Sequence, residues 1–166
     1  MEKAYFAGGC FWCITPTFRQ MEGVVQVISG YSGGDEENPA YEDVKNQRTG
    51  HRETICIEFE PTAVTFEALM QVFLDGVDPF DEGGQFIDRG FSYTLAVYYL
   101  NPEQKTVVQA MLHRLQTETG KVPYVAVEPF KNFYTAEEYH QDYDLKNPEA
   151  FRRELVESGR MKKGTA

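Results

Sequence analysis

Hydrophobic and polar residues alternate most clearly over residues 51–60, a pattern that predicts a β-strand. One face of this strand carries the apolar side chains of Ile55, Ile57 and Phe59. Glu53 shares their parity, whereas Cys56 falls on the opposite face, because successive side chains of a strand point to opposite sides of the sheet. We therefore expect the Glu53 carboxyl group to point into the core, where burial would raise its pKa. A surface glutamate at a fraying strand end is the alternative interpretation.

The spacing of apolar residues elsewhere predicts a mixture of strands and helices. Further strands are predicted over residues 4–7, 24–30, 93–100 and 125–128. Helices are predicted from residue 10 onward, as a short helix that a turn at residues 38–44 leads into, over residues 66–74, from Pro102 to a stop before Gly120, and over residues 149–157. Residues 78–90 and the aromatic stretch after residue 128 are predicted to be loops. Long loops and a short second helix favour an α+β domain with a mixed sheet over a doubly wound parallel sheet.

The length of 166 residues suits one domain, and a hydrophobic content of 42% is enough for a sizeable core. A net charge of −10 without a basic stripe argues against nucleic-acid binding. No apolar run is long enough for a membrane span, and no signal peptide is visible, which favours the cytoplasm. We expect residues 1–166 to form a single, monomeric catalytic domain whose tail after about residue 158 is mobile.

The segment at residues 9–13 contains two of the three cysteines and the only tryptophan. It follows a predicted strand and a double glycine and begins a predicted helix, which places Cys10 at a helix N-terminus. Free backbone N–H groups and the helix dipole lower the pKa of a thiol there, and the thiolate is the nucleophilic form. Cys13 follows one turn later and can reach Cys10. Phe11 and Trp12 between the two sulfurs indicate an apolar pocket beside a redox thiol.

Other interpretations of these cysteines stay open at this point. The two residues could be small core side chains. A non-catalytic thiol- or metal-binding module is a further possibility, but a zinc site needs about four ligands, and only Cys56 and three scattered histidines could complete one. A thioredoxin-like disulfide oxidoreductase could use Cys10 and Cys13 without Glu53 or any tyrosine.

Several blocks of sequence carry a resemblance to a known family. They are GCFW at residues 9–12, SGYSGG at 29–34 with NPAY at 38–41, TGHRE at 49–53, FYTAEEYHQ at 133–141 and, less specifically, QFIDRG at 85–90. Together and in this order they resemble the A-type peptide methionine sulfoxide reductases across most of the chain. The resemblance implies an α+β two-layer sandwich with a ferredoxin-like core and a long C-terminal coil.

The resemblance also implies an enzyme that reduces the S-epimer of methionine sulfoxide, free or in proteins. A cysteine sulfenic acid would form and become a disulfide, which an external dithiol such as thioredoxin would reduce, with no cofactor. The family's roles fall on Cys10 as nucleophile, Glu53 as acid, Tyr41 and Tyr93 as hydroxyl donors to the sulfoxide oxygen, Phe11 and Trp12 as the wall for the methyl group, and Asp88 as a supporting polar residue.

Two departures from the family pattern concern turnover and substrate contact. Many members have glycine where this chain has Cys13 and use cysteines in a C-terminal tail, but residues 162–166 contain none. We therefore expect Cys13 to resolve the sulfenic acid, with Cys56 as the alternative. Ser92 and Thr94 replace residues of the family's Gln-Tyr-Arg-Ser motif, which leaves the details of substrate contact open.

The histidines are expected to have structural or surface positions. His51 lies near Glu53 in the sequence and is expected to shape the turn, with direct participation as the alternative. His113 falls on the polar side of its predicted helix, and His140 is expected to support the site from below. The C-terminal aromatic residues are expected to cover the core.

Overall fold

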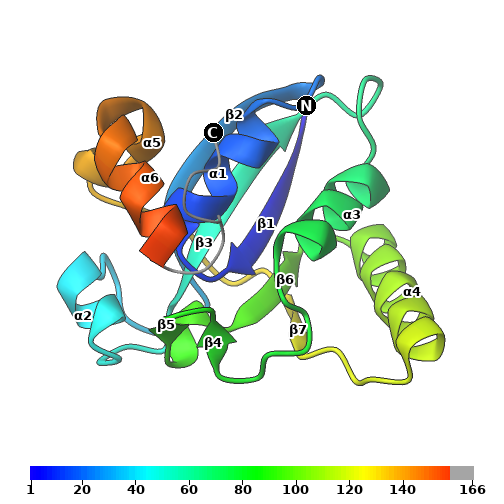
Figure 1. The fold of residues 1–166 in the computed structure, drawn as a ribbon. Helices are drawn as coiled ribbons and strands as arrows, with labels where there is room; N and C mark the ends of the chain where they lie inside the picture. The colour runs from blue at the N-terminus through cyan, green and yellow to red at the C-terminus, as the bar shows by residue number, and fades with distance from the viewer. Residues whose placement is uncertain (158–166) are drawn as a thin grey trace.

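A six-stranded sheet organises the chain, of which the computed structural model describes residues 1–157 (Figure 1). Its strands are β1 (Glu2–Gly8), β2 (Val24–Ser32), β3 (Arg52–Phe59), β6 (Leu95–Tyr99), β7 (Val125–Pro129) and β8 (Tyr134–Thr135). They lie in the order β7-β6-β1-β3-β2-β8. β7 pairs with β6 in parallel, and the other neighbouring strands pair antiparallel, so the sheet is mixed as the sequence predicts.

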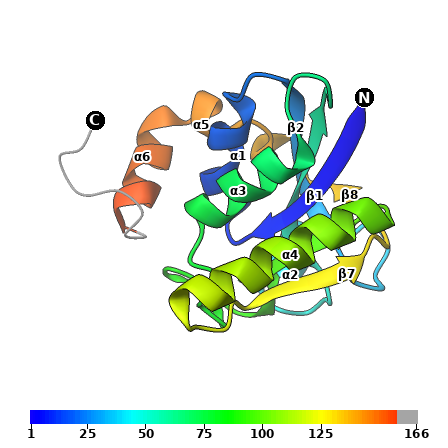
Figure 2. The same cartoon turned by 90° about the vertical axis from the view of Figure 1, so that its right-hand side faces the viewer.

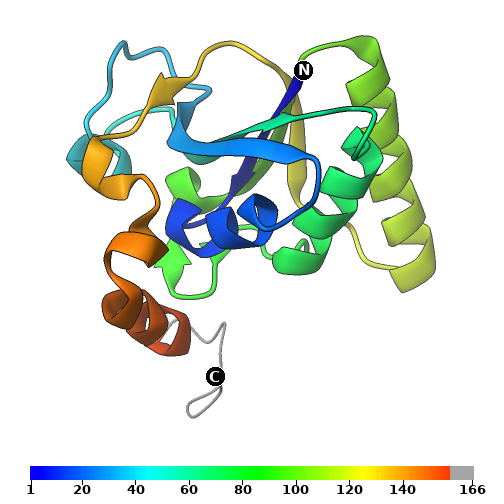
Figure 3. The same ribbon diagram turned by 90° about the horizontal axis from the view of Figure 1, so that it is seen from above.

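Six helices accompany the sheet within residues 1–157: α1 (Phe11–Arg19), α2 (Tyr41–Lys45), α3 (Phe66–Gly76), α4 (Pro102–Thr119), α5 (Tyr143–Lys146) and α6 (Pro148–Glu157). Three of them cover one face of the sheet (Figure 1). α1, α3 and α4 lie side by side on the same face (Figures 2 and 3) and close a core that includes the buried rings of Phe6, Phe59 and Phe73. The coil after β7 covers the opposite face, where Phe130 stacks on Tyr5 at 4.3 Å between ring centroids.

The chain order β1-α1-β2-β3-α3-β6, with the strands arranged β6-β1-β3-β2 and all antiparallel, is the ferredoxin-like arrangement. The predicted α+β class is therefore confirmed. The strand register also determines where the site forms. Gly8 at the end of β1 pairs with Leu95 at the start of β6, and Phe6 pairs with Ile55 near the start of β3. The start of α1, the start of β3 and the segment before β6 consequently meet at one end of the sheet.

Local signals determine where the longer helices begin and end. The side chain of Thr65 accepts a hydrogen bond from the first turn of α3 at 3.0 Å, and Asn101 does the same for α4 at 2.9 Å. Gly120 ends α4 in the left-handed conformation with a φ of 71°. No helix in the part of the chain that the structure describes is long and apolar enough to cross a membrane.

Three segments differ from the sequence-based predictions. Tyr93 lies in the 3-10 helix η1 (Phe91–Tyr93) and not in a strand, because Gly90 takes a φ of 121° and its carbonyl accepts the Tyr93 N–H at 3.0 Å. The predicted loop at residues 78–90 contains the hairpin of β4 (Gly84–Gln85) and β5 (Asp88–Arg89). The expected C-terminal coil contains β8, the 3-10 helix η2 (Glu138–His140) and α5. The tail expected after residue 158 lies outside the described residues.

Candidate active site

The candidate site is built around the start of α1. β1 ends at Gly8, and Gly9 turns the chain with a φ of 85°, a conformation that glycine adopts without strain. Cys10 is the N-cap residue of the helix, with extended backbone geometry and a carbonyl that accepts the Cys13 N–H at 3.1 Å. The residue is only 6% exposed. The predicted position of Cys10 at a helix N-terminus is therefore confirmed.

The pKa of Cys10 differs from the prediction. A hydrogen bond with the Cys13 side chain, burial away from water and the nearby carboxylates of Glu53 and Asp88 raise this pKa well above the ordinary value of a thiol. These effects outweigh the helix N-terminus, so the expected lowering of the thiol pKa is wrong for this structure. The same contact shows that the Cys10 and Cys13 side chains lie within hydrogen-bonding reach, as the Cys-x-x-Cys spacing predicts.

Glu53 points inward from the start of β3 and is 1% exposed, which confirms the prediction from its parity. Its Oε1 accepts the Phe11 N–H at 3.2 Å, whereas its buried Oε2 has no hydrogen-bond partner among the described residues. Burial raises the pKa of Glu53 to about 8; the Phe11 amide opposes this rise and the charge of Asp88 adds to it. The nearby Tyr93 hydroxyl also opposes the rise in the pKa of Glu53.

Two tyrosines reach the same place from separate segments, Tyr41 from α2 and Tyr93 from η1. Burial, followed by the negative charge of Glu53, raises the pKa of both hydroxyls above the usual tyrosine value. Both side chains therefore stay protonated and can act as hydrogen-bond donors at neutral pH. Glu137 anchors the start of α2, because its two carboxylate oxygens accept the Tyr41 N–H at 3.1 Å and the Tyr31 hydroxyl at 2.8 Å.

An aromatic cluster forms an apolar wall beside Cys10. Phe11 is fully buried, and Trp12 is half-buried with Tyr143 stacked on it at 3.9 Å between centroids and 10° between planes. The Trp12 Nε1–H donates to Nδ1 of His140 at 3.0 Å, so the proton of the neutral imidazole is on Nε2. Burial lowers the pKa of His140 to about 4, and its ring therefore stays neutral at pH 7.

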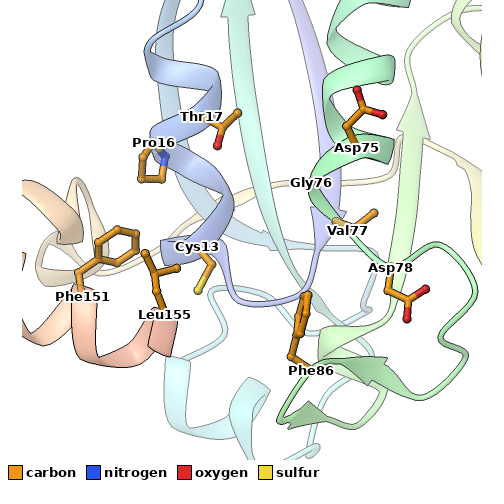
Figure 4. A pocket seen from close by; sticks show the side chains of 10 residues that line it. All are labelled: Cys13, Pro16, Thr17, Asp75, Gly76, Val77, Asp78, Phe86, Phe151 and Leu155. Carbon is orange, nitrogen blue, oxygen red and sulfur yellow. The ribbon is translucent and has the colours of Figure 1, made fainter. Parts of the chain in front are cut away.

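Cys13 opens onto a groove of about 490 Å³ that Cys10 does not line. The groove runs between α1, the end of α3, the tip of the β4–β5 hairpin and α6 (Figure 4). Phe86 reaches it from the hairpin with a φ of 54°, a conformation that aromatic residues rarely adopt. Phe151 and Leu155 line its other side from α6 (Figure 4).

Cys56 lies on the opposite face of β3, buried beside Tyr5 under the coil that covers that face. The sheet therefore separates it from Cys10 and Cys13, as the parity of the strand predicts. The geometry does not favour Cys56 as the resolving residue. Within residues 1–157, no group of three or more His, Cys, Asp or Glu side chains is placed to hold a metal ion.

His51 and His113 have the positions that the sequence predicts. His51 is fully buried, and its Nδ1 accepts the Gly34 N–H at 3.2 Å while its Nε2 lies 2.8 Å from the carbonyl of Glu36. Both ring nitrogens therefore bind the backbone of the loop that follows β2, and neither binds a residue of the candidate site. His113 is exposed on α4.

Ser92 and Thr94, the two departures from the family motif, stabilise the turn that carries Tyr93. The buried Ser92 donates its N–H to Oε1 of Gln47 at 3.0 Å, and its hydroxyl accepts Nε2–H of Gln47 at 2.8 Å. Arg52 donates from Nε to the Thr94 hydroxyl at 2.9 Å. Both residues therefore act on the backbone around Tyr93.

Two contributions to the site were not predicted from the sequence. Tyr143 stacks on Trp12, and Glu137 anchors Tyr41, although both come from the C-terminal region that was expected to be core cover and loop. Glu137 lies in the block at residues 133–141 that carries the family resemblance, and this block was the available signal. No local pattern links Tyr143 to a residue about 130 positions earlier.

Comparisons with known proteins identify the relatives of this chain. A family model described as "Peptide methionine sulfoxide reductase" matches residues 2–165. Peptide methionine sulfoxide reductase MsrA of Bacillus velezensis is 47% identical over 163 residues, which cover 96% of this chain and 92% of that protein.

Two solved structures are similar to this chain. Methionine sulfoxide reductase A of Corynebacterium diphtheriae has a TM-score of 0.81 and 30% identity, over 89% of this chain and 75% of that one. Mxr1 from Saccharomyces cerevisiae in reduced form has a TM-score of 0.84 and 28% identity, over 89% and 86%. The chain belongs to the peptide methionine sulfoxide reductase family.

Proposed function

We propose that this protein reduces the S-epimer of methionine sulfoxide, free and in proteins, with Cys10 as the nucleophile and Glu53 as the acid. As a member of its family it is an oxidoreductase that converts methionine sulfoxide to methionine. The epimer and the residue roles are what the resemblance to the A-type enzymes implies, and the geometry of the site supports these roles.

The free, buried oxygen of Glu53 is the observation that carries this proposal. A sulfoxide oxygen bears negative charge, so attack at the sulfur needs an acid that protonates this oxygen. A carboxyl group with a pKa of about 8 keeps its proton at neutral pH. Because Oε1 is held by the Phe11 amide, Oε2 is the atom available to carry and donate the proton.

The two tyrosine hydroxyls support the same step. Tyr41 and Tyr93 lie close enough to Glu53 for its charge to raise their pKa values, and both stay protonated. Donors positioned toward an oxygen that gains charge in the transition state each contribute roughly 2–4 kcal/mol. Asp88 supports the arrangement because its charge helps to keep the Glu53 and Cys10 protons in place.

The aromatic wall selects the substrate. Trp12 is half-buried and offers apolar surface but no charge for recognition, and the fully buried Phe11 supports its ring from inside the core. Such a surface suits the methyl group on the sulfur of methionine sulfoxide. His140 and Tyr143 keep the Trp12 ring in one orientation.

The first chemical step is balanced within the site. The sulfur of the substrate gains two electrons and leaves as the thioether of methionine, while Cys10 loses two electrons and becomes a sulfenic acid. Glu53 gives a proton to the departing oxygen, and the proton that the Cys10 thiol loses replaces it. The Cys13 thiol then condenses with the sulfenic acid, which releases water and forms a Cys10–Cys13 disulfide.

Regeneration requires a dithiol that supplies two electrons and two protons. We propose a thioredoxin-type protein for this role. Mxr1, whose reduced form resembles this chain, has also been solved in complex with Trx2.

Separate incubations with the S- and R-epimers of methionine sulfoxide test the proposal, with dithiothreitol as reductant and methionine as the measured product. We expect methionine from the S-epimer alone. A parallel assay of insulin disulfide reduction tests the thioredoxin-like alternative. Fast insulin reduction without methionine formation, or a preference for the R-epimer, would contradict the proposed function.

A further inference from the structure

We infer that the groove beside Cys13 is the docking surface for a protein dithiol reductant, which attacks the Cys13 sulfur of the Cys10–Cys13 disulfide. This inference rests on the proposed function, because the disulfide forms only if Cys13 resolves the sulfenic acid. It goes further than the proposed function because it assigns the sulfur that is attacked, the groove from which the attack comes, and the kind of surface that the partner carries.

Access separates the two sulfurs. Cys10 is 6% exposed and does not line the groove, whereas Cys13 is half-buried and lines it (Figure 4). Thiol–disulfide exchange requires the incoming thiolate to contact the sulfur that it attacks. The sulfur of Cys13 is therefore the one that a thiol on a folded partner can reach, and Cys10 is the leaving thiolate.

The walls of the groove offer apolar surface on both sides of this sulfur. At the hairpin tip, Phe86 is 38% exposed and Ile87 is 57% exposed. On the other side, α6 has no fully buried residue, and its Phe151 and Leu155 stay half-buried along the groove. The positive φ of Phe86 costs about 1–3 kcal/mol, so the fold holds an aromatic ring at this rim at the expense of stability. A small polar dithiol gains little from such walls, whereas a protein with apolar residues around its thiol gains contact area.

The charge of the rim points to the same partner. The carboxylates of Asp75 and Asp78 lie exposed at the α3 end of the groove, and the whole chain has a net charge of −10. A partner with a basic residue beside its thiol would be attracted to this rim, and one with an acidic surface would be repelled. The partner is therefore a protein whose reactive thiol lies on an apolar surface with basic residues at its edge.

An oxidised substrate protein fits the groove less well. The sulfoxide must reach Glu53, Tyr41 and Tyr93, and none of these three residues lines the groove. A reductant needs to reach only the sulfur of Cys13, and Cys13 lines the groove.

The exchange is balanced in two steps. The thiolate of the partner bonds to the Cys13 sulfur, the Cys10–Cys13 bond breaks, and Cys10 leaves with the electron pair and takes a proton. The second partner thiol then attacks the partner sulfur of this mixed disulfide, and Cys13 leaves and is protonated. The enzyme gains two electrons and two protons, and the partner becomes a disulfide.

Phe86→Gly is the most direct test of the docking surface. Glycine accepts a φ of 54° without strain, so the variant removes the ring and keeps or raises stability. With thioredoxin as the reductant, we expect KM for thioredoxin to rise about tenfold, while turnover with dithiothreitol stays unchanged. Leu155→Asp should act in the same way. Leu100→Asp is the matched control, because this leucine is 42% exposed directly after the end of β6 and does not line the groove.

The outcomes are distinct. An unchanged KM for thioredoxin in both groove variants would overturn the inference. It would also be overturned if these variants raised the KM for an oxidised substrate protein and left the KM for thioredoxin unchanged. Failure of the wild-type enzyme with dithiothreitol would instead contradict the proposed function. A thioredoxin variant with a single reactive cysteine should trap a mixed disulfide with the oxidised enzyme. Mass spectrometry should place that bond on Cys13, and a bond on Cys10 would refute the assignment.

Discussion

The backbone N–H of Phe11 donates a hydrogen bond to Oε1 of Glu53 at 3.2 Å, which links the start of α1 to the start of β3. Phe11 directly follows Cys10, so one bond holds the proposed nucleophile and the proposed acid in a single rigid unit. The bond uses one carboxylate oxygen and leaves the other, also buried, available for a proton. The division of roles between the two oxygens makes Glu53 the residue most informative to change.

Glu53→Gln should lower methionine formation from the S-epimer by about 10²–10³. The glutamine oxygen can still accept the Phe11 N–H, so the packing is kept, but the amide has no acidic proton to give. The measurement is the rate of the first turnover, which reports sulfenic acid formation alone. Glu58→Gln is the matched control, because Glu58 lies on the same strand but faces Lys3 at the surface. Equal rates in wild type and Glu53→Gln would exclude the acid role.

The raised pKa of Glu53 should also appear in the stability of the protein. Its pKa is about 8 in the folded protein and near 4.5 for an exposed carboxyl group. Between these values the folded protein holds a proton that the unfolded chain has released. The free energy of unfolding should therefore fall as the pH rises from about 4.5 to about 8 and should then level off. Urea denaturation at several pH values measures this, and the contribution should be missing in Glu53→Gln. An identical decline in both proteins would place its origin elsewhere.

The inward direction of Glu53 was predictable because it depends only on how side chains alternate between the two faces of one strand. The structure confirms this alternation for Cys56 as well, which lies on the opposite face. The turn at Tyr93 was not predictable in the same way. The run after Ser92 is rich in aromatic and branched residues and resembles a strand, but the positive φ of Gly90 and the contacts of Ser92 with Gln47 make a 3-10 turn. The decisive partner lies about 45 residues away.

The pKa of Cys10 illustrates the same limit for the site. A helix N-terminus lowers a thiol pKa, and that position was predicted correctly. The direction of the pKa shift depends first on the hydrogen bond with Cys13, one turn away, and then on burial and on the charges of Glu53 and Asp88, which come from distant segments. The family resemblance predicted which residues lie around Cys10, but it did not predict how their charges and hydrogen bonds together shift its pKa.

Cys13→Ser should separate the first turnover from cycling. The variant keeps Cys10 and Glu53, so we expect about one methionine per enzyme molecule in the absence of a second thiol. Thioredoxin-driven turnover should be lost, because no disulfide forms for thioredoxin to reduce. Cys56→Ser is the control, and it should cycle normally because Cys56 lies on the opposite face of the sheet. Normal cycling in Cys13→Ser together with loss in Cys56→Ser would reverse this assignment.

His140→Phe should weaken substrate binding through Trp12. The phenyl ring keeps the packing against Tyr41 and Phe11 but removes the acceptor of the Trp12 Nε1–H. A polar group that loses its partner in a largely buried place costs about 1–3 kcal/mol, and the indole ring can turn to recover a contact with water. We expect KM for methionine sulfoxide to rise about tenfold with a smaller change in kcat.

His140→Gln distinguishes this role of His140 from a proton-transfer role, because a glutamine oxygen can accept the same Trp12 N–H but cannot relay a proton. It should restore most of the substrate affinity. The low pKa of His140, about 4, keeps the ring neutral, so the effect of His140→Phe on KM should not vary between about pH 6 and about pH 8. A KM effect of His140→Phe that follows a titration in this range, or a Gln variant as impaired as the Phe variant, would show that His140 does more than hold Trp12.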